Sequence, residues 1–187
     1  MKKFIIFTLF SILLIMVSCT DQEKDPCPVY IDPEAKDYAN YAIDITSLVP
    51  PTMKTINLYS KKKNPSSTLS SLDDTKLDKM VTYWERIDGG TIAPKPFELH
   101  WTVLIPAGGT ATLNNVPLMA DEQLLEMPFT QLLPENGGRD PETGNMIIVC
   151  RAKTYFYCHT VQGCDIVAGP MYTTFEFYYG GAKWKNF

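Results

Sequence analysis

The chain has 187 residues, of which 45% are hydrophobic, 12% aromatic and 20% charged, and its formal net charge is −4 at pH 7. This length suits one domain with a substantial core, and nothing in the composition calls for a second domain. An acidic protein repels phosphate backbones and gains no counterion release from them, so the charge disfavours nucleic-acid binding.

The first nineteen residues, MKKFIIFTLFSILLIMVSC, are ordered like an export signal. Two lysines follow the initial methionine, residues 4–17 are almost all apolar, and small residues lead up to Cys19. The apolar run is shorter than the ~20 residues that a membrane-spanning helix needs. The segment resembles the precursor of a bacterial lipoprotein, which implies a signal peptide at 1–18, acylation of Cys19 and attachment to a membrane through that lipid.

A polar stretch follows, and we interpret residues 19–36 as the lipidated cysteine and a flexible tether. Its acidic residues Asp21, Glu23 and Asp25 resemble the export signal of surface lipoproteins in Bacteroidota. That resemblance implies a location in the outer membrane, exposed on the cell surface, with attachment facing the periplasm as the alternative. Removal of residues 1–18 leaves 15 basic and 21 acidic side chains, so the mature chain carries a net charge of about −6.

Alternation of apolar and polar residues dominates residues 37–187, which we assign to a single domain. The clearest strand runs from Phe97 to Ile105, where every odd position is apolar. Breaks rich in glycine and proline fall at 49–51, 64–65, 88–90, 106–109, 136–138 and 168–170. This spacing predicts an all-β fold, an antiparallel immunoglobulin-like β-sandwich of about seven strands. The other predicted strands are 41–46, 54–59, 110–116, 146–160 and 171–179.

Two segments are ambiguous in this reading. In residues 75–88, Leu77, Met80 and Trp84 follow helical spacing, whereas the run from Val81 to Trp84 is rich in strand formers. We favour a strand there, because a tryptophan in an early-middle strand is a common core feature of sandwiches. Residues 118–133 mix leucines with acids and prolines. For them we predict one or two helical turns or an irregular crossover that packs through the leucines.

Four cysteines lie beyond the signal segment. Cys150 and Cys158 lie on one predicted strand, about 26 Å apart at ~3.3 Å per residue, so they cannot bond to each other. Cys158 and Cys164 flank a short loop that a disulfide would close, which leaves Cys27 to pair with Cys150 or leaves both free. A zinc site is disfavoured, because Cys158 and His159 project to opposite faces of a strand and no second pair of ligands follows. We therefore expect no metal and no cofactor.

His100 and His159 are the two histidines of the chain. Neither lies in a known catalytic motif, and the sequence has no nucleophile elbow, zinc-protease, phosphate-loop or dinucleotide-binding pattern. Residues 139–145 hold oxygen donors as in part of a calcium loop, but the terminal glutamate is missing, so a turn is favoured. We expect a protein without catalytic residues, with a hydrolase as the less favoured alternative.

Outward aromatic side chains are the candidate ligand contacts, whereas Trp101 falls on the apolar side of its strand and is assigned to the core. Flat rings with polar neighbours stack on sugars and also form protein contacts. We interpret the chain as a non-enzymatic binding or structural protein of the cell surface, for glycan capture or a surface complex. A fimbrial or adhesin-type subunit is the alternative. The candidate contacts are Tyr155, Tyr157, Tyr172, Tyr178 and Trp184.

Overall fold

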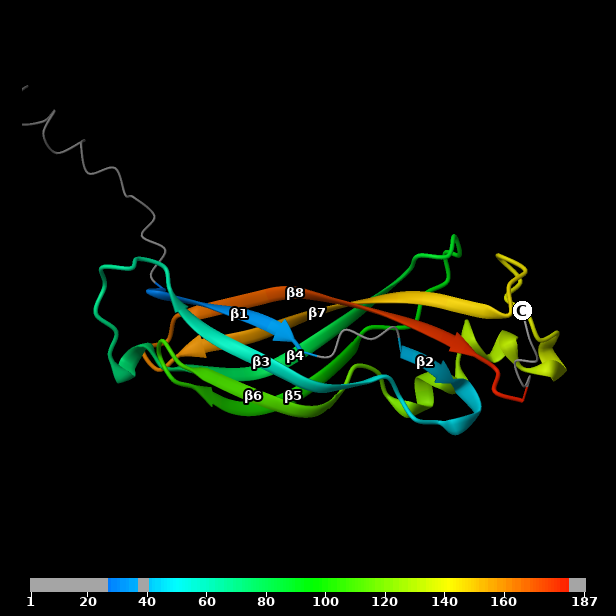
Figure 1. Ribbon diagram of the computed structural model, residues 1–187, viewed down its shortest axis with the longest axis horizontal. Coiled ribbons are helices and arrows are strands. Elements are labelled where there is room, and N and C mark those ends of the chain that lie inside the picture. The colour runs from blue at the N-terminus through cyan, green and yellow to red at the C-terminus, as the bar shows by residue number, and fades with distance from the viewer. Residues whose placement is uncertain (1–26, 37–40, 182–187) are drawn as a thin grey trace, which may run out of the picture.

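A computed structural model describes residues 27–36 and 41–181. They form eight strands in two sheets, one of them curled like half a barrel, so the predicted all-β fold is confirmed (Figure 1). Neighbouring strands are antiparallel except β2 and β8, which are parallel. In spatial order, the three-stranded sheet holds β1 (Val29–Ala35), β3 (Thr52–Lys62) and β6 (Thr110–Pro117), and the five-stranded sheet holds β2 (Tyr41–Asp44), β8 (Asp165–Tyr178), β7 (Ile147–Thr160), β4 (Thr75–Arg86) and β5 (Phe97–Ile105).

The core lies between the two sheets, and the two-residue period of the strands decides which side chains enter it. Along β7 every even-numbered residue is buried and every odd-numbered residue is partly exposed. Phe156, Phe175 and Phe177 are fully buried and belong to one apolar cluster with Ile56 and Leu58 of the facing sheet. Each fully buried side chain of this size stabilises the fold by about 1.5–3 kcal/mol, so the alternation fixes which face of each strand is inside.

The ambiguous segment at 75–88 forms the strand β4, as the strand formers favoured. Its helical spacing has a structural cause, because the register shifts between Leu77 and Lys79 and leaves Asp78 as an extra residue opposite β7. Such a bulge moves the next inward side chain on by one position, to Met80. Beyond the bulge the two-residue period resumes as far as Trp84, which is buried.

The crossover between β6 and β7 consists of short 3-10 turns, Asp121–Leu125, Phe129–Leu132 and Pro134–Asn136. It packs on the two sheets through Leu118, Leu124 and Leu132, as predicted. Phe129 adds a ring contact that was not predicted, with its centroid 4.2 Å from that of Phe177. No helix within the described ranges is long and apolar enough to cross a bilayer.

The predicted tether was drawn too far along the chain. Residues 29–35 form β1, in which Val29, Ile31 and Ala35 are buried, and Cys27 is buried as well. The two-residue period was obscured because Pro33, which is not a strand former, occupies one of its inward positions. A proline is tolerated in β1 because this strand forms an edge of its sheet. Within the described residues the folded body therefore begins at Cys27, and not at residue 37.

The predicted break at 168–170 is also wrong, because these residues lie inside β8. The register of β7 and β8 shifts between Thr154 and Phe156, where the chain of β8 bulges. Gly169 has φ of +104°, and a Cβ atom there would approach the Thr154 carbonyl oxygen to 2.7 Å. β2 pairs only with residues 175–178 of β8, so Pro170 has no partner strand on that side. The N–H that proline lacks is therefore not needed there.

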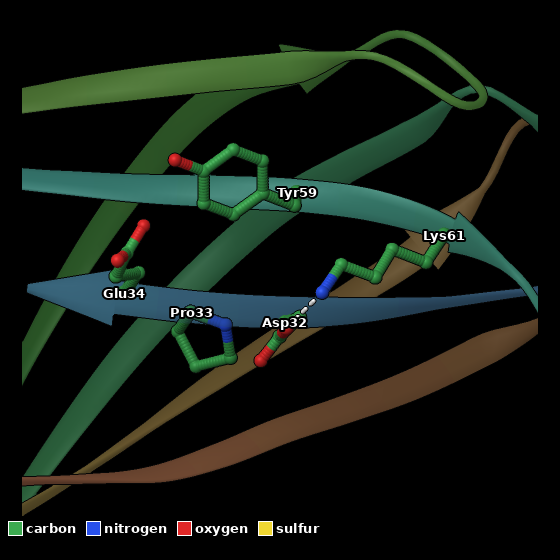
Figure 2. Close-up of a pocket in the computed structure, with 5 residues that line it drawn as sticks. All are labelled: Asp32, Pro33, Glu34, Tyr59 and Lys61. Carbon is green, nitrogen blue, oxygen red and sulfur yellow. Dashed lines mark hydrogen bonds and ion pairs between the residues drawn. The ribbon is translucent and has the colours of Figure 1, made fainter.

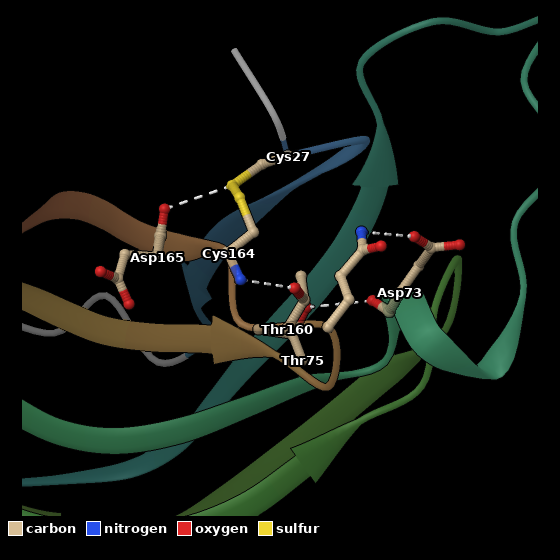
Figure 3. Close-up of a disulfide and its surroundings, with 7 residues drawn as sticks. Cys27, Asp73, Thr75, Thr160, Cys164 and Asp165 are labelled. Atoms are coloured by element: carbon tan, nitrogen blue, oxygen red, sulfur yellow. Dashed lines mark hydrogen bonds between the residues drawn. A yellow bond between two sulfur atoms is a disulfide. The ribbon is translucent and has the colours of Figure 1, made fainter. Parts of the chain in front are cut away.

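The disulfide joins Cys27 to Cys164, so the predicted Cys158–Cys164 and Cys27–Cys150 pairings are wrong (Figure 3). Cys158 is opposite Ile166 in the β7–β8 hairpin, and its free thiol points into the core, as does that of Cys150. Cys164 instead closes the hairpin turn, where its carbonyl accepts a 2.8 Å bond from the Thr160 N–H. The bridge spans 137 positions and ties the start of the described body to this hairpin.

At the opposite end of the molecule, a buried ion-pair cluster holds two loops together. Arg86, at the end of β4, has a side chain that is 1% exposed and donates to Asp88 at 2.7 Å and to Asp140 at 2.8 Å. Glu142 accepts bonds of 2.9 Å from the backbone N–H groups of Thr91 and Ile92. The acids of the 139–145 segment thus contact Arg86 and the β4–β5 loop, as part of a turn.

We expect Cys27→Ala to destabilise the protein by about 5 kcal/mol, because the bridge closes a loop of more than a hundred residues in the unfolded chain. Non-reducing peptide mapping should recover a linked pair of peptides containing Cys27 and Cys164. The matched change Cys158→Ala should leave that pair intact. Recovery of Cys158 in a disulfide would contradict the assignment.

Asp140→Ala should destabilise the protein by about 3–5 kcal/mol in urea unfolding, because it removes one of the two buried carboxylates that hydrogen-bond to the buried Arg86. Glu126→Ala is the control, since its ion pair with Lys95 is exposed and is worth less than about 1 kcal/mol. Equal losses in both variants would refute the role of the cluster.

The same cluster predicts a loss of stability in acid. Burial by itself raises the pKa of Asp88 and Asp140, but their hydrogen bonds with Arg86 and with neighbouring backbone and hydroxyl groups together outweigh it and hold the pKa below the ordinary 3.8. The contribution is therefore complete above about pH 4 and is lost as the pH falls further, through the lowered values. Between about pH 5 and about pH 2, the free energy of unfolding in urea should therefore fall less in Asp140→Ala than in the wild type.

Candidate functional site

The outward face of the five-stranded sheet gathers four tyrosines from three strands, and we call this set the tyrosine face. Tyr83 lies on β4, Tyr155 and Tyr157 on β7, and Tyr172 on β8. The register brings them together, because Tyr83 and Tyr172 are both paired with Lys153, from its two sides. Each ring points outward because its neighbours along the strand are buried in the core.

Two rings of this face are in direct contact. Tyr83 and Tyr155 meet edge to face, with centroids 5.9 Å apart and planes at 81°. Val81 lies in the same face, directly opposite Tyr155, and is 6% exposed. Tyr83 and Tyr172 remain 41% and 50% exposed. Burial raises the pKa of the Tyr157 hydroxyl, and the neighbouring Tyr83 adds to the rise, so the Tyr157 hydroxyl stays protonated at neutral pH and can donate a hydrogen bond.

Charged side chains are interleaved with the rings. The Lys79 ammonium lies 5.3 Å from the centroid of Tyr157, and the Arg151 guanidinium lies 6.0 Å from that of Tyr172. Glu85 accepts from Arg151 at 3.4 Å and pairs with Lys153. Its hydrogen bond raises the pKa of Lys153, which therefore keeps its charge. The face thus combines flat aromatic rings with hydrogen-bonding side chains of positive and negative charge.

Three of the four tyrosines were predicted from the sequence as ligand contacts. Tyr155, Tyr157 and Tyr172 lie together, whereas Tyr178 lies on the same strand as Tyr172 but six residues further on, about 20 Å away. Trp184 lies outside the described residues. Tyr83 was missed because its segment was read ambiguously. A strand at 75–86 with Trp84 inward points Tyr83 outward, and that was the available signal.

His100 on β5 and His159 on β7 lie on different strands, each beside one carboxylate. His100 is exposed and its Nε2 lies 3.0 Å from Glu98, while the Nδ1 of His159 lies 2.6 Å from Asp78. No serine, threonine or cysteine side chain of the described ranges hydrogen-bonds either ring. Burial raises the pKa of both free thiols, Cys150 and Cys158, to about 12, so they are protonated at neutral pH.

No metal-binding group of three or more histidine, cysteine, aspartate or glutamate residues occurs in the described part of the chain. Trp101, assigned to the core from the sequence, is only partly buried and packs against the core from β5.

A shallow depression of about 440 Å³ lies on the other side of the molecule, on the outward face of the three-stranded sheet (Figure 2). Asp32 and Lys61 pair with each other across it, beside Pro33, Glu34 and Tyr59. Its charges largely satisfy one another, and it offers one ring where the tyrosine face offers four. The tyrosine face is therefore the stronger candidate.

Comparison with known proteins assigns no family. No family model matches the sequence, and no curated protein matches it. One solved structure, described as the X-ray structure of a Northeast Structural Genomics Consortium target, aligns with 85% of this chain and 91% of its own. The alignment has 11% identity and a TM-score of 0.33, and the description names no function.

Proposed function

We propose that this chain is a lipid-anchored protein of the outer membrane, exposed on the cell surface, that binds a glycan through the tyrosine face without catalysing a reaction. The observation that carries the proposal is the interleaving of exposed rings with charged side chains on one face. Sugar rings present apolar faces that stack on aromatic rings, and their hydroxyls hydrogen-bond to charged side chains.

The disulfide supports export. A bridge between Cys27 and Cys164 persists in an oxidising compartment, which agrees with the signal-like segment that ends at Cys19. Only eight positions separate Cys19 from Cys27, and an extended chain of that length spans at most about 30 Å. An acyl group on Cys19 would therefore hold the body close to the membrane.

The strand order supports an immunoglobulin-like sandwich as the scaffold. If β1, β3, β4, β6, β7 and β8 are taken as strands A, B, C, E, F and G, the two sheets read A-B-E and G-F-C. β5 then occupies the place beside C where variable-type domains add a strand. In this scaffold the tyrosine face is the outward surface of the G-F-C sheet, which is solvent-accessible on one side.

Acylation of Cys19 is the first test of the proposal. Metabolic labelling with a fatty-acid analogue should mark the wild-type chain and should leave Cys19→Ala unmarked, and only the wild type should sediment with outer membranes. Equal labelling of both chains would remove the anchor.

The second test addresses the ligand. Tyr83→Ala and Tyr172→Ala should each weaken binding on a glycan array by about 1–3 kcal/mol, or roughly 5- to 150-fold in Kd. Tyr30→Ala is the matched control, because Tyr30 is also 41% exposed but lies on the three-stranded sheet. His100→Ala and His159→Ala should bind like the wild type. Loss of binding in the histidine variants at unchanged thermal stability would favour a catalytic or metal site.

A further inference from the structure

A basic segment lies at the end of the body where the described chain begins. Residues 61–72, which lead from the end of β3 towards β4, contain three lysines and no acid. Lys62 is paired with Val29 of β1, and the N–H of Lys63 donates a 2.9 Å bond to the Pro28 carbonyl. The lysines therefore lie beside the first residues of the body, at the left of Figure 1.

This end is also the one that a lipid on Cys19 would hold near a membrane. Eight positions separate Cys19 from Cys27, and that length of chain spans at most about 30 Å. The disulfide to Cys164 fixes Cys27 beside the β7–β8 hairpin, so the preceding chain enters the body at one defined point. An acylated Cys19 therefore brings this end, and not the end with Arg86, to the bilayer.

The lysines of the segment are exposed, and their charges are only partly neutralised. Lys61 pairs with Asp32 of β1. The Lys62 ammonium donates instead to the Ser67 carbonyl, at 2.6 Å, and that oxygen carries no formal charge. The positive charge of Lys62 is therefore available to an anionic partner.

The acids that follow the segment are engaged within the fold. Asp73 is buried and accepts a 2.8 Å bond from a backbone N–H of its own turn, and Asp74 accepts one of 2.8 Å from the Ala107 N–H. Asp165, next to the disulfide, is exposed. Three lysines thus lie near two solvent-accessible acids, Asp32 and Asp165, which gives this end a positive excess in a protein whose formal net charge is −4.

Two exposed apolar side chains lie at the same end. Leu72 and Val161 are 56% and 55% exposed, in the turns before β4 and after β7. Backbone bonds join these turns, since the N–H groups of Val161 and Gln162 donate to the Asp74 and Leu72 carbonyls at 2.8 and 3.1 Å. Lysines beside apolar side chains form a surface that binds anionic bilayers, because the apolar groups enter the headgroup boundary and the lysines attract the lipid charges.

We propose, on the basis of the lipid anchor proposed above, that this end of the body docks on the negatively charged headgroups of the membrane that holds the anchor. Leu72 and Val161 enter the headgroup boundary, and Lys62 lies against the lipid phosphates. The long strands β7 and β8 run away from this end (Figure 1). The tyrosine face lies along their length, so docking leaves it open to solvent.

Acetylation footprinting of the full chain on vesicles measures which lysines the bilayer covers. The chain would be bound to vesicles of phosphatidylcholine, with and without phosphatidylglycerol, and the modification of each lysine would be quantified by mass spectrometry. Phosphatidylglycerol should slow the acetylation of Lys62 by about threefold or more, because an anionic surface attracts a nearby lysine roughly fivefold. Lys95, which is 74% exposed in the β4–β5 loop at the opposite end, should react equally on both. Equal reactivity of Lys62 on both vesicles would overturn the proposal.

Leu72→Asp tests the apolar part of the contact. The aspartate removes an apolar group and repels the anionic surface, so most of the protection of Lys62 should be lost. Leu125→Asp is the matched control, because Leu125 is 58% exposed but lies in the crossover at the opposite end (Figure 1). It should leave Lys62 as protected as in the wild type. Equal protection in all three chains would contradict the docking of Leu72.

Failure of the anchor and failure of the docking contact give different results. A chain that takes up no fatty-acid label on Cys19 would contradict the anchor. A chain that is labelled and floats with the vesicles, but whose Lys62 is not protected by phosphatidylglycerol, would contradict the docking contact and leave the anchor intact.

Discussion

The unbroken alternation of β7 is the constraint on which the rest of the structure depends. Its fourteen residues send one set of side chains into the core and the other set to the outward face. A slip of one residue would exchange the two sets, burying Lys153 and exposing Phe156. Burial of the inward set therefore holds Tyr155 and Tyr157 outward. The strands on either side, β4 and β8, take their register from β7 and add Tyr83 and Tyr172.

The two ends of the two-sheet body are held by different interactions. At one end the Cys27–Cys164 bridge ties the start of the body to the β7–β8 hairpin (Figure 3). At the other end Arg86 and its acids tie the loop after β4 to the loop before β7. Neither group contributes a side chain to the tyrosine face. Both restrain the long central strands that carry it, so the face is a rigid surface and not a set of loops.

The sequence was sufficient where the period was uninterrupted and failed where a local irregularity changed it. The strands β5 and β7 were predicted closely, because their alternation is simple. The bulge at Asp78 imitated a helical spacing, and Gly169 with Pro170 imitated a turn although both lie within β8. The disulfide depended on where β1 places Cys27, which is a long-range property that spacing along the chain does not report.

Nitration footprinting is the most direct test of the proposal that a glycan binds on the tyrosine face. The full-length protein would be nitrated with and without a glycan that binds it on an array, and each tyrosine would be quantified by mass spectrometry. The account predicts protection of Tyr83 and Tyr172 by the glycan and none of Tyr30, which lies on the opposite sheet. Protection of Tyr30 and Tyr59, with Tyr83 and Tyr172 still fully reactive, would contradict it.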